Sequence, residues 1–265
     1  MSKLIFCELE RLSKNKLIWC LFVCVPLLAY LTKGYIQSFY PTDIVSTSVF
    51  VIAGLRENLF LPCNIAVAAI VAAVYTEEYR GGQLRLMFLR QYSRAKIFFS
   101  KLLVINIIII ALLVVMGISL SVIGLFQFPH DGEKQISLIV DLGFIVQYYF
   151  LAYLTLMAIS CFFSYISLIS KNTTFMLGIT VGYVLMSLLF DGIYLHFANL
   201  FVSGSFMHEL VAYVLIPYMQ HTGLYSLLNE RNLHSILPMA LILISYMVIF
   251  VWTAYRRFVV DDYLY

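Results

Sequence analysis

The stretch LLVINIIIIALLVVMGISLSVIGLF, residues 102–126, has no charged side chain and is interrupted only by Asn106 and small residues. A helix needs about 20 mostly apolar residues to cross the hydrocarbon core of a membrane. The rest of the chain shares this character, because 62% of its 265 residues are hydrophobic and only 12% are charged. About 25% of the residues in a soluble domain are charged. The sequence therefore predicts an all-α integral membrane protein.

Five further stretches on either side have the length and apolar character of a membrane span. The six predicted spans cover residues 17–35, 59–75, 102–126, 136–169, 175–195 and 236–255. The fourth is longer than a membrane requires, which predicts a tilted helix or one that extends beyond the bilayer. We expect these spans to form a single transmembrane domain over residues 1–265.

The Lys and Arg residues predict the orientation of the spans. If the N-terminus is cytoplasmic, all but four of the 17 basic residues lie on the cytoplasmic side. The four exceptions are Lys33, Arg56, Lys134 and Arg231. This bias is the one expected from the positive-inside rule, so we expect both termini in the cytoplasm. The frequent use of Ile, Leu, Tyr and Phe is typical of AT-rich bacterial genomes, and we expect a bacterial cell membrane.

Two segments outside the spans are partly apolar. In residues 1–15, apolar side chains share one helical face and charged side chains lie opposite, which predicts an interfacial helix on the membrane surface. The apolar face holds Ile5, Leu9 and Leu12. The charged face holds Lys3, Glu10, Arg11 and Lys14. Residues 196–235 are apolar but too interrupted to span, so we expect an extracytoplasmic region that dips into the membrane between the fifth and sixth spans.

A charged segment, residues 76–101, separates the second and third spans. Gly81 and Gly82 break the helix that leaves the second span. Three apolar residues then follow at helical spacing, which predicts a short amphipathic helix on the cytoplasmic surface. They are Leu84, Met87 and Phe88. Ser93 occupies the N-cap position of the next helix, and Lys101 marks the entry of that helix into lipid. An ordinary positive-inside loop also explains the charge of this segment.

The order of residues in this segment resembles the cytoplasmic loop of ABC-2-type transporter permeases. In that family an acidic residue ends the second span, and Gly-Thr, a leucine-bearing turn, Pro-x-Ser-Arg and a Lys follow. The matching positions are Glu78, Gly82, Leu84, Leu89, Ser93, Arg94 and Lys101. The chain departs from the pattern where Gln83 replaces Thr and where Gln91 or Tyr92 replaces Pro. The family layout of a surface helix, six spans and membrane-dipping helices before the last span also matches the expectations above.

The resemblance implies a coupling helix over residues 83–90 that docks in a groove of an ATPase subunit. Its apolar side chains would enter a pocket, and its arginines would pair with acidic residues at the rim. The coupling residues implied by the resemblance are Glu78, Gly82, Gln83, Leu84, Arg85, Met87, Phe88, Arg90, Ser93 and Arg94.

The sequence shows no ATP-binding motif of its own. A phosphate-binding loop needs a Gly-Lys pair, and none of the 13 glycines is followed by Lys. We therefore expect no cofactor on this chain, with ATP and Mg²⁺ bound by a separate ATPase. Two permease chains, identical or different, would line a two-fold pathway. Gly178 and Gly182 give the fifth span a small-x-x-x-small face that suits either such a dimer or packing within one chain.

Three uncharged polar residues lie within predicted spans, and polar groups inside a membrane are candidates for a transport pathway. They are Asn64, Asn106 and Gln147. Hydrogen bonding between helices explains such residues equally well. No acidic or basic residue lies clearly at the middle of a span, which argues against an ion-coupled carrier.

These patterns favour an exporter of apolar or amphipathic cargo, such as a peptide, an antibiotic or a lipid-like molecule. Its expected partners are an ATPase, a second permease chain and membrane lipids, with no nucleic acid. The alternative is a membrane enzyme or a regulatory scaffold without an ATPase. Enzymatic signatures are weak, because the pair His208-Glu209 lacks the second histidine of H-E-x-x-H and no G-x-S-x-G motif is present.

Overall fold

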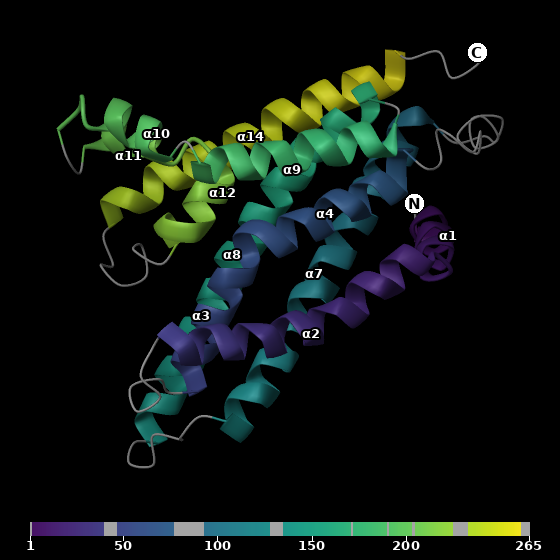
Figure 1. Ribbon diagram of the computed structural model, residues 1–265. Helices are drawn as coiled ribbons and strands as arrows, with labels where there is room; N and C mark the ends of the chain where they lie inside the picture. Colours follow the sequence, from purple (N-terminus) through teal and green to yellow (C-terminus); the bar gives the residue numbers. More distant parts are fainter. Residues whose placement is uncertain are drawn as a thin grey trace.

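The computed structural model describes residues 2–39, 47–76, 93–127, 135–170, 172–189, 191–202, 205–224 and 233–260. Within these ranges the chain is almost entirely helical and contains no strand, so the all-α prediction is confirmed (Figure 1). The N-terminal elements are α1 (Ser2–Ser13), α2 (Lys16–Phe39), α3 (Thr47–Asn58), η1 (Leu59–Cys63), α4 (Asn64–Val71), η2 (Ala72–Thr76) and α7 (Arg94–Gln127). The C-terminal elements are α8 (Gln135–Ser170), α9 (Thr173–Leu189), α10 (Asp191–Ala198), α11 (Phe206–Ala212), α12 (Ile216–Tyr218), η3 (Met219–Gly223) and α14 (Leu233–Val260).

Five helical stretches in the described residues are long and apolar enough to cross a membrane. They are Lys16–Ser38, Thr47–Thr76, Arg94–Gln127, Leu142–Ser170 and Leu237–Val260. The predicted fifth span corresponds to α9, whose 17 residues fall short of the roughly 20 that a full crossing needs. The six spans and the cytoplasmic termini therefore stay predictions, whereas the all-helical membrane architecture is established.

The helix that contains the second span begins earlier than its apolar run. Residues 47–76 form one continuous helix in which α3, η1, α4 and η2 follow each other without a break. Arg56 and Glu57 interrupt the apolar run before the predicted start of the span at residue 59, but they do not interrupt the helix. Their side chains lie 3.5 Å apart as an ion pair. Pro62 lies in η1, a π-helical turn, and such turns are common where proline disturbs the helical hydrogen bonding.

The outer surface of α7 is apolar along most of its length. Its outward side chains recur every three or four residues and are each between 42% and 60% exposed, namely Leu103, Ile107, Ile110, Val114, Ile118, Val122 and Leu125. A soluble protein does not leave a continuous apolar surface of this extent open to water. Lipid hydrocarbon is the environment that suits this face, and it gives the membrane assignment a basis in structure as well as composition.

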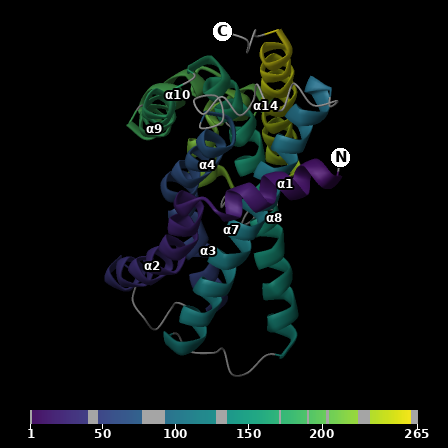
Figure 2. The same cartoon turned by 90° about the vertical axis from the view of Figure 1, so that its right-hand side faces the viewer.

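The long helices run back and forth between two ends of the bundle (Figures 1 and 2). At one end lie α1, the last residue of η2, the first turn of α7 and the last turn of α14. We call this the loop end, because the charged segment 77–92 connects η2 to α7 there. The short helices α10, α11, α12 and η3 lie toward the opposite end (Figure 1). Whether residues 196–235 enter the membrane stays a prediction.

Candidate functional site

The two ends of the segment 77–92 are tied to the bundle by side-chain hydrogen bonds. On one side, the hydroxyl groups of Thr76 and Ser167 lie 2.7 Å apart, and both residues are buried. On the other side, the guanidinium of Arg94 donates to the carbonyl oxygen of Val259 in the last turn of α14. Carbonyl groups in a last helical turn lack a partner within their own helix. The segment therefore leaves and re-enters the bundle at positions fixed by α8 and α14.

Ser93 begins α7 as the sequence predicted. Its hydroxyl accepts a hydrogen bond from the backbone N–H of Lys96 at 3.4 Å, and its carbonyl accepts one from Ile97 at 3.2 Å. This is the bonding of a helix N-cap residue. Residues 94–101, which the prediction included in the cytoplasmic coupling loop, are helical.

Aromatic side chains pack between the ends of η2, α7 and α14. Phe98 lies at the centre, with its ring centroid 6.3 Å from that of Tyr75, 5.7 Å from Tyr255 and 5.6 Å from Phe258. The rings of Tyr75 and Phe258 complete the contact at 6.5 Å. Tyr75, Phe98 and Phe258 are each at most 1% exposed. Fully buried rings pack at high density and resist displacement, so this contact joins the three helix ends firmly.

A buried ion cluster ties α1 to the same place. Lys101 is 0% exposed and donates from Nζ to Glu8 Oε1 at 2.8 Å and to the carbonyl oxygen of Val74 at 3.5 Å. Glu8 is 4% exposed, and its Oε2 lies 3.0 Å from Arg11 Nη2. The Glu8–Lys101 pair thus joins α1, α7 and the end of the second span. We name Thr76, Arg94, Lys101, Glu8 and the Phe98 ring cluster together the loop frame.

The structure adds two details to the predicted surroundings of these residues. The side chain of Lys101 is enclosed by protein and paired with Glu8. The buried face of α1 includes Glu8, between the buried Leu4 and Leu12. By contrast, Glu10 and Lys14 lie on the exposed side as predicted, 2.8 Å apart. The hydrogen bond from Lys14 lowers the pKa of Glu10.

Most of the predicted coupling residues lie outside the described part of the chain. They are Glu78, Gly82, Gln83, Leu84, Arg85, Met87, Phe88 and Arg90. Ser93 and Arg94 are described, and both hold the start of α7. The contribution of the loop frame was missed because its main contact joins residues 93 positions apart, which no local periodicity reveals.

Asn64, one of the three predicted pathway residues, belongs to a buried polar cluster. Its amide nitrogen donates to Gln220 Oε1 at 2.6 Å and to the carbonyl oxygen of Phe60 at 2.7 Å. Gln220 Nε2 donates in turn to Thr155 Oγ1 at 3.0 Å. Asn64, Thr155 and Gln220 are all 0% exposed. The cluster links α4, α8 and η3, and it is the interhelical hydrogen bonding that the sequence left open as an alternative.

The other two pathway residues lie elsewhere. Asn106 donates to the carbonyl oxygen of Leu102 in its own helix at 3.0 Å. Gln147 is exposed on α8. The structure of this chain therefore does not bring Asn64, Asn106 and Gln147 to one place.

Replacing Gln220 with leucine should destabilise the protein, because the amide of Asn64 loses a buried partner. Leaving a buried polar group unsatisfied costs about 1–3 kcal/mol. The thiol of Cys161, which is 3% exposed, can report unfolding on heating through its labelling rate, after the exposed Cys7, Cys20 and Cys24 are replaced by serine. The exposed Gln147→Leu is the matched control and should leave the midpoint unchanged. Equal midpoints for both variants would contradict the role of the cluster.

The small-residue face of α9 is open. A Cβ atom built on Gly178 or on Gly182 would meet no heavy atom within 4 Å. Among the described residues, neither glycine is therefore used for close packing within the chain.

Comparison with known protein families assigns the chain to one of them. The family described as ABC-2 family transporter protein matches residues 4–187, from α1 almost to the end of α9. The chain belongs to the ABC-2 transporter family. Its resemblance to ABC-2-type permeases is thereby confirmed, and with it the role of a membrane-embedded transport subunit that is not itself a catalyst. The segment 77–92 and its frame lie inside the matched region. No curated protein sequence matches the chain.

Proposed function

We propose that this chain is the membrane subunit of an ABC-2-type exporter in a bacterial cell membrane and that a separate ATPase drives it. The observation that carries the proposal is the loop frame, which ties the helices at both ends of the segment 77–92 to α8, α14 and α1. A docking segment can move spans only if it is rigidly joined to them. Membership of the ABC-2 family gives the matching expectation of an ATPase partner.

The frame suggests how a movement of the segment would reach the spans. A displacement of its first residue acts on Thr76 and, through Ser167, on α8. A displacement of its last residue acts on Arg94 and, through the carbonyl oxygen of Val259, on α14. The ring cluster around Phe98 and the Glu8–Lys101 pair carry the same movement to α1. Packed interiors shift between discrete arrangements more readily than they deform.

The exposed rim of the loop end is basic. Lys3, Lys96, Arg256 and Arg257 are exposed there, in addition to Lys14 and Lys16. Such a rim attracts an acidic partner surface and the anionic headgroups of the cytoplasmic leaflet. Both attractions favour placing this end in the cytoplasm, where ATP is available.

Affinity purification of the tagged chain from its native cell in a mild detergent tests the proposal. We expect one soluble ATPase to co-purify in stoichiometric amount, identified by mass spectrometry and by a phosphate-binding loop in its sequence. An abundant, folded preparation without an ATPase would refute the proposed motor, although it would leave the family assignment intact.

We propose further that two permease chains assemble through α9. The support is the open face around Gly178 and Gly182, since small residues let membrane helices approach closely. Gly178→Ile with Gly182→Ile should weaken the dimer about tenfold or more, measured by native mass spectrometry in detergent. Gly143→Ile is the matched control, because a Cβ at this α8 position also meets nothing within 4 Å. An unchanged dimer in the α9 variant would place the interface elsewhere.

The proposed cargo is apolar or amphipathic, and the proposed direction is outward. The support is the composition of the described spans, which are dominated by aliphatic and aromatic side chains. Comparing the resistance of cells with and without the chain to amphipathic antimicrobial peptides and to lipid-like antibiotics tests this proposal. Greater resistance when the chain is present supports it, and equal resistance across both classes of compound refutes it.

A further inference from the structure

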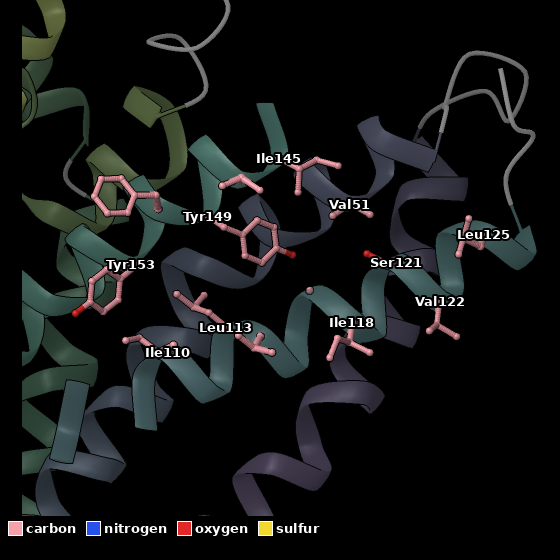
Figure 3. Close-up of a pocket in the computed structure, with 14 residues that line it drawn as sticks. Val51, Ile110, Leu113, Ile118, Ser121, Val122, Leu125, Ile145, Tyr149 and Tyr153 are labelled. Atoms are coloured by element: carbon pink, nitrogen blue, oxygen red, sulfur yellow. The ribbon is translucent and has the colours of Figure 1, made fainter. Parts of the chain in front are cut away.

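An elongated groove runs along the outside of the bundle between α3, α7 and α8 (Figure 3). Its volume is about 710 Å³, within the range of roughly 300–1,000 Å³ that small-molecule sites occupy. Aliphatic side chains such as Val51, Ile110 and Val114 form most of its walls. The polar groups that line it are hydroxyls, from Ser121, Tyr149 and Tyr153.

One of these hydroxyls is placed in an unusual way. The oxygen of Tyr149 is buried, and it has no hydrogen-bond partner among the described residues. Its ring lies over Gly117, where a Cβ would come within 3.2 Å of the ring atom Cε1. Figure 3 shows the hydroxyl groups of Tyr149 and Ser121 directed into the groove. A buried hydroxyl without a partner costs free energy, so this one favours a ligand that brings an acceptor.

The position of the groove along the membrane normal indicates which part of a lipid could supply that acceptor. Lys101 lies in the second turn of α7, and Ser121 lies about 30 Å further along the helix at 1.5 Å per residue. Ser167 marks the loop end of α8, and Tyr149 lies about 27 Å from it by the same measure. The hydrocarbon core of a bilayer is about 30 Å thick. With the near boundary of the core set at Lys101 and Ser167, both hydroxyls fall at its far boundary, at the level of lipid ester groups.

We propose that this groove binds a membrane lipid of the leaflet opposite the loop end. An acyl chain lies against Ile110, Val114 and Gly117, and an ester carbonyl oxygen of the lipid accepts a hydrogen bond from Tyr149. The mouth of the groove supports this occupant, because its rim of Ile118 and Val146 is 60% and 66% exposed on helices that face lipid. The inference concerns the chain itself and does not depend on the proposed ATPase, cargo or direction of transport.

Photo-crosslinking in lipid nanodiscs tests the site on the purified full chain. The probe is an ester-linked phospholipid with a diazirine near the carbonyl end of its acyl chain, and labelled peptides are mapped by mass spectrometry. We expect labelling to concentrate on the parts of α7 and α8 around Ser121 and Tyr149. Tyr149→Phe should lower this labelling about three- to tenfold, as expected for the loss of one hydrogen bond. An ether-linked probe should show no such difference.

A second pair of variants separates the groove from the general lipid surface. Val114→Trp fills the groove, whereas Ile107→Trp adds the same ring to the same exposed stripe of α7 without lining it. We expect labelling to fall at least fivefold in the first variant and to stay unchanged in the second. Labelling spread evenly over the outward faces of α2, α7 and α14 would overturn the proposal. Absence of groove labelling in the unaltered chain, together with loss of a dimer in the Val114→Trp variant, would overturn it too and would assign this face to a partner chain.

Discussion

Replacing Glu8 with leucine should lower the free energy of unfolding by about 3–5 kcal/mol, the cost of removing one partner from a buried ion pair. Lys101 is fully buried, and its ammonium group lies 2.8 Å from the Glu8 carboxylate. The variant keeps Lys101 in a site of low polarity without this carboxylate. The labelling rate of Cys161 on heating, in the serine background described above, measures the loss. Transport should fail in the same variant because α1 separates from the loop frame.

Two further variants distinguish the ion pair from a simple packing effect. Glu8→Leu combined with Lys101→Met should recover most of the lost stability, since replacing both charges by apolar side chains of similar size is often neutral or stabilising. Lys14→Met removes a lysine from the exposed Glu10 pair and should leave the unfolding midpoint unchanged. If the double variant is no more stable than Glu8→Leu alone, the contact stabilises through shape rather than charge.

Replacing Phe88 with aspartate should release the ATPase and abolish transport while the chain still inserts. A charge placed in the apolar anchor of an interface costs about 2 kcal/mol or more, which corresponds to roughly a thirtyfold loss of affinity. The readouts are the amount of ATPase recovered with the tagged chain and the ATP hydrolysis of the purified complex.

The matched control for this variant is Gln91→Asp. It introduces the same charge into the same segment, just beyond the proposed coupling helix over residues 83–90, and should keep the ATPase bound. Equal recovery of the ATPase with Phe88→Asp and with the unaltered chain would show that residues 83–90 do not form the docking surface. The loop frame would then need another role.

Continuous apolar runs made most of the helical architecture predictable. The third span was expected over residues 102–126 and lies within α7, and the fourth was expected over 136–169 and is matched by α8. The start of the helix that contains the second span was harder to predict, because Arg56 and Glu57 resemble the end of a helix. Charged residues that pair with each other near the boundary of the core remain compatible with helix, and hydropathy cannot register that pairing.

The candidate site was only half predictable. Ser93 carries a local signal, since an N-cap residue acts on the residues that follow it. The sequence around Glu8 gives no signal of its burial, because a carboxylate in an amphipathic helix normally lies on the polar face. Its inward position depends on Lys101, and the position of Asn64 depends on Gln220, 156 residues away. Such contacts are set by how the helices pack, not by the pattern within any one of them.

The pairing of Glu8 with Lys101 also has a consequence for biogenesis. The ribosome makes α1 before α7, and the lysine that donates to the Glu8 carboxylate is made 93 residues after Glu8. Until α7 has entered the bilayer, Glu8 cannot be buried without a large desolvation penalty, so α1 must wait at the aqueous surface. We therefore expect α1, although it is made before α7, to dock only after α7 has inserted. Docking of α1 then requires that α7 has inserted and that the end of the second span lies beside α7.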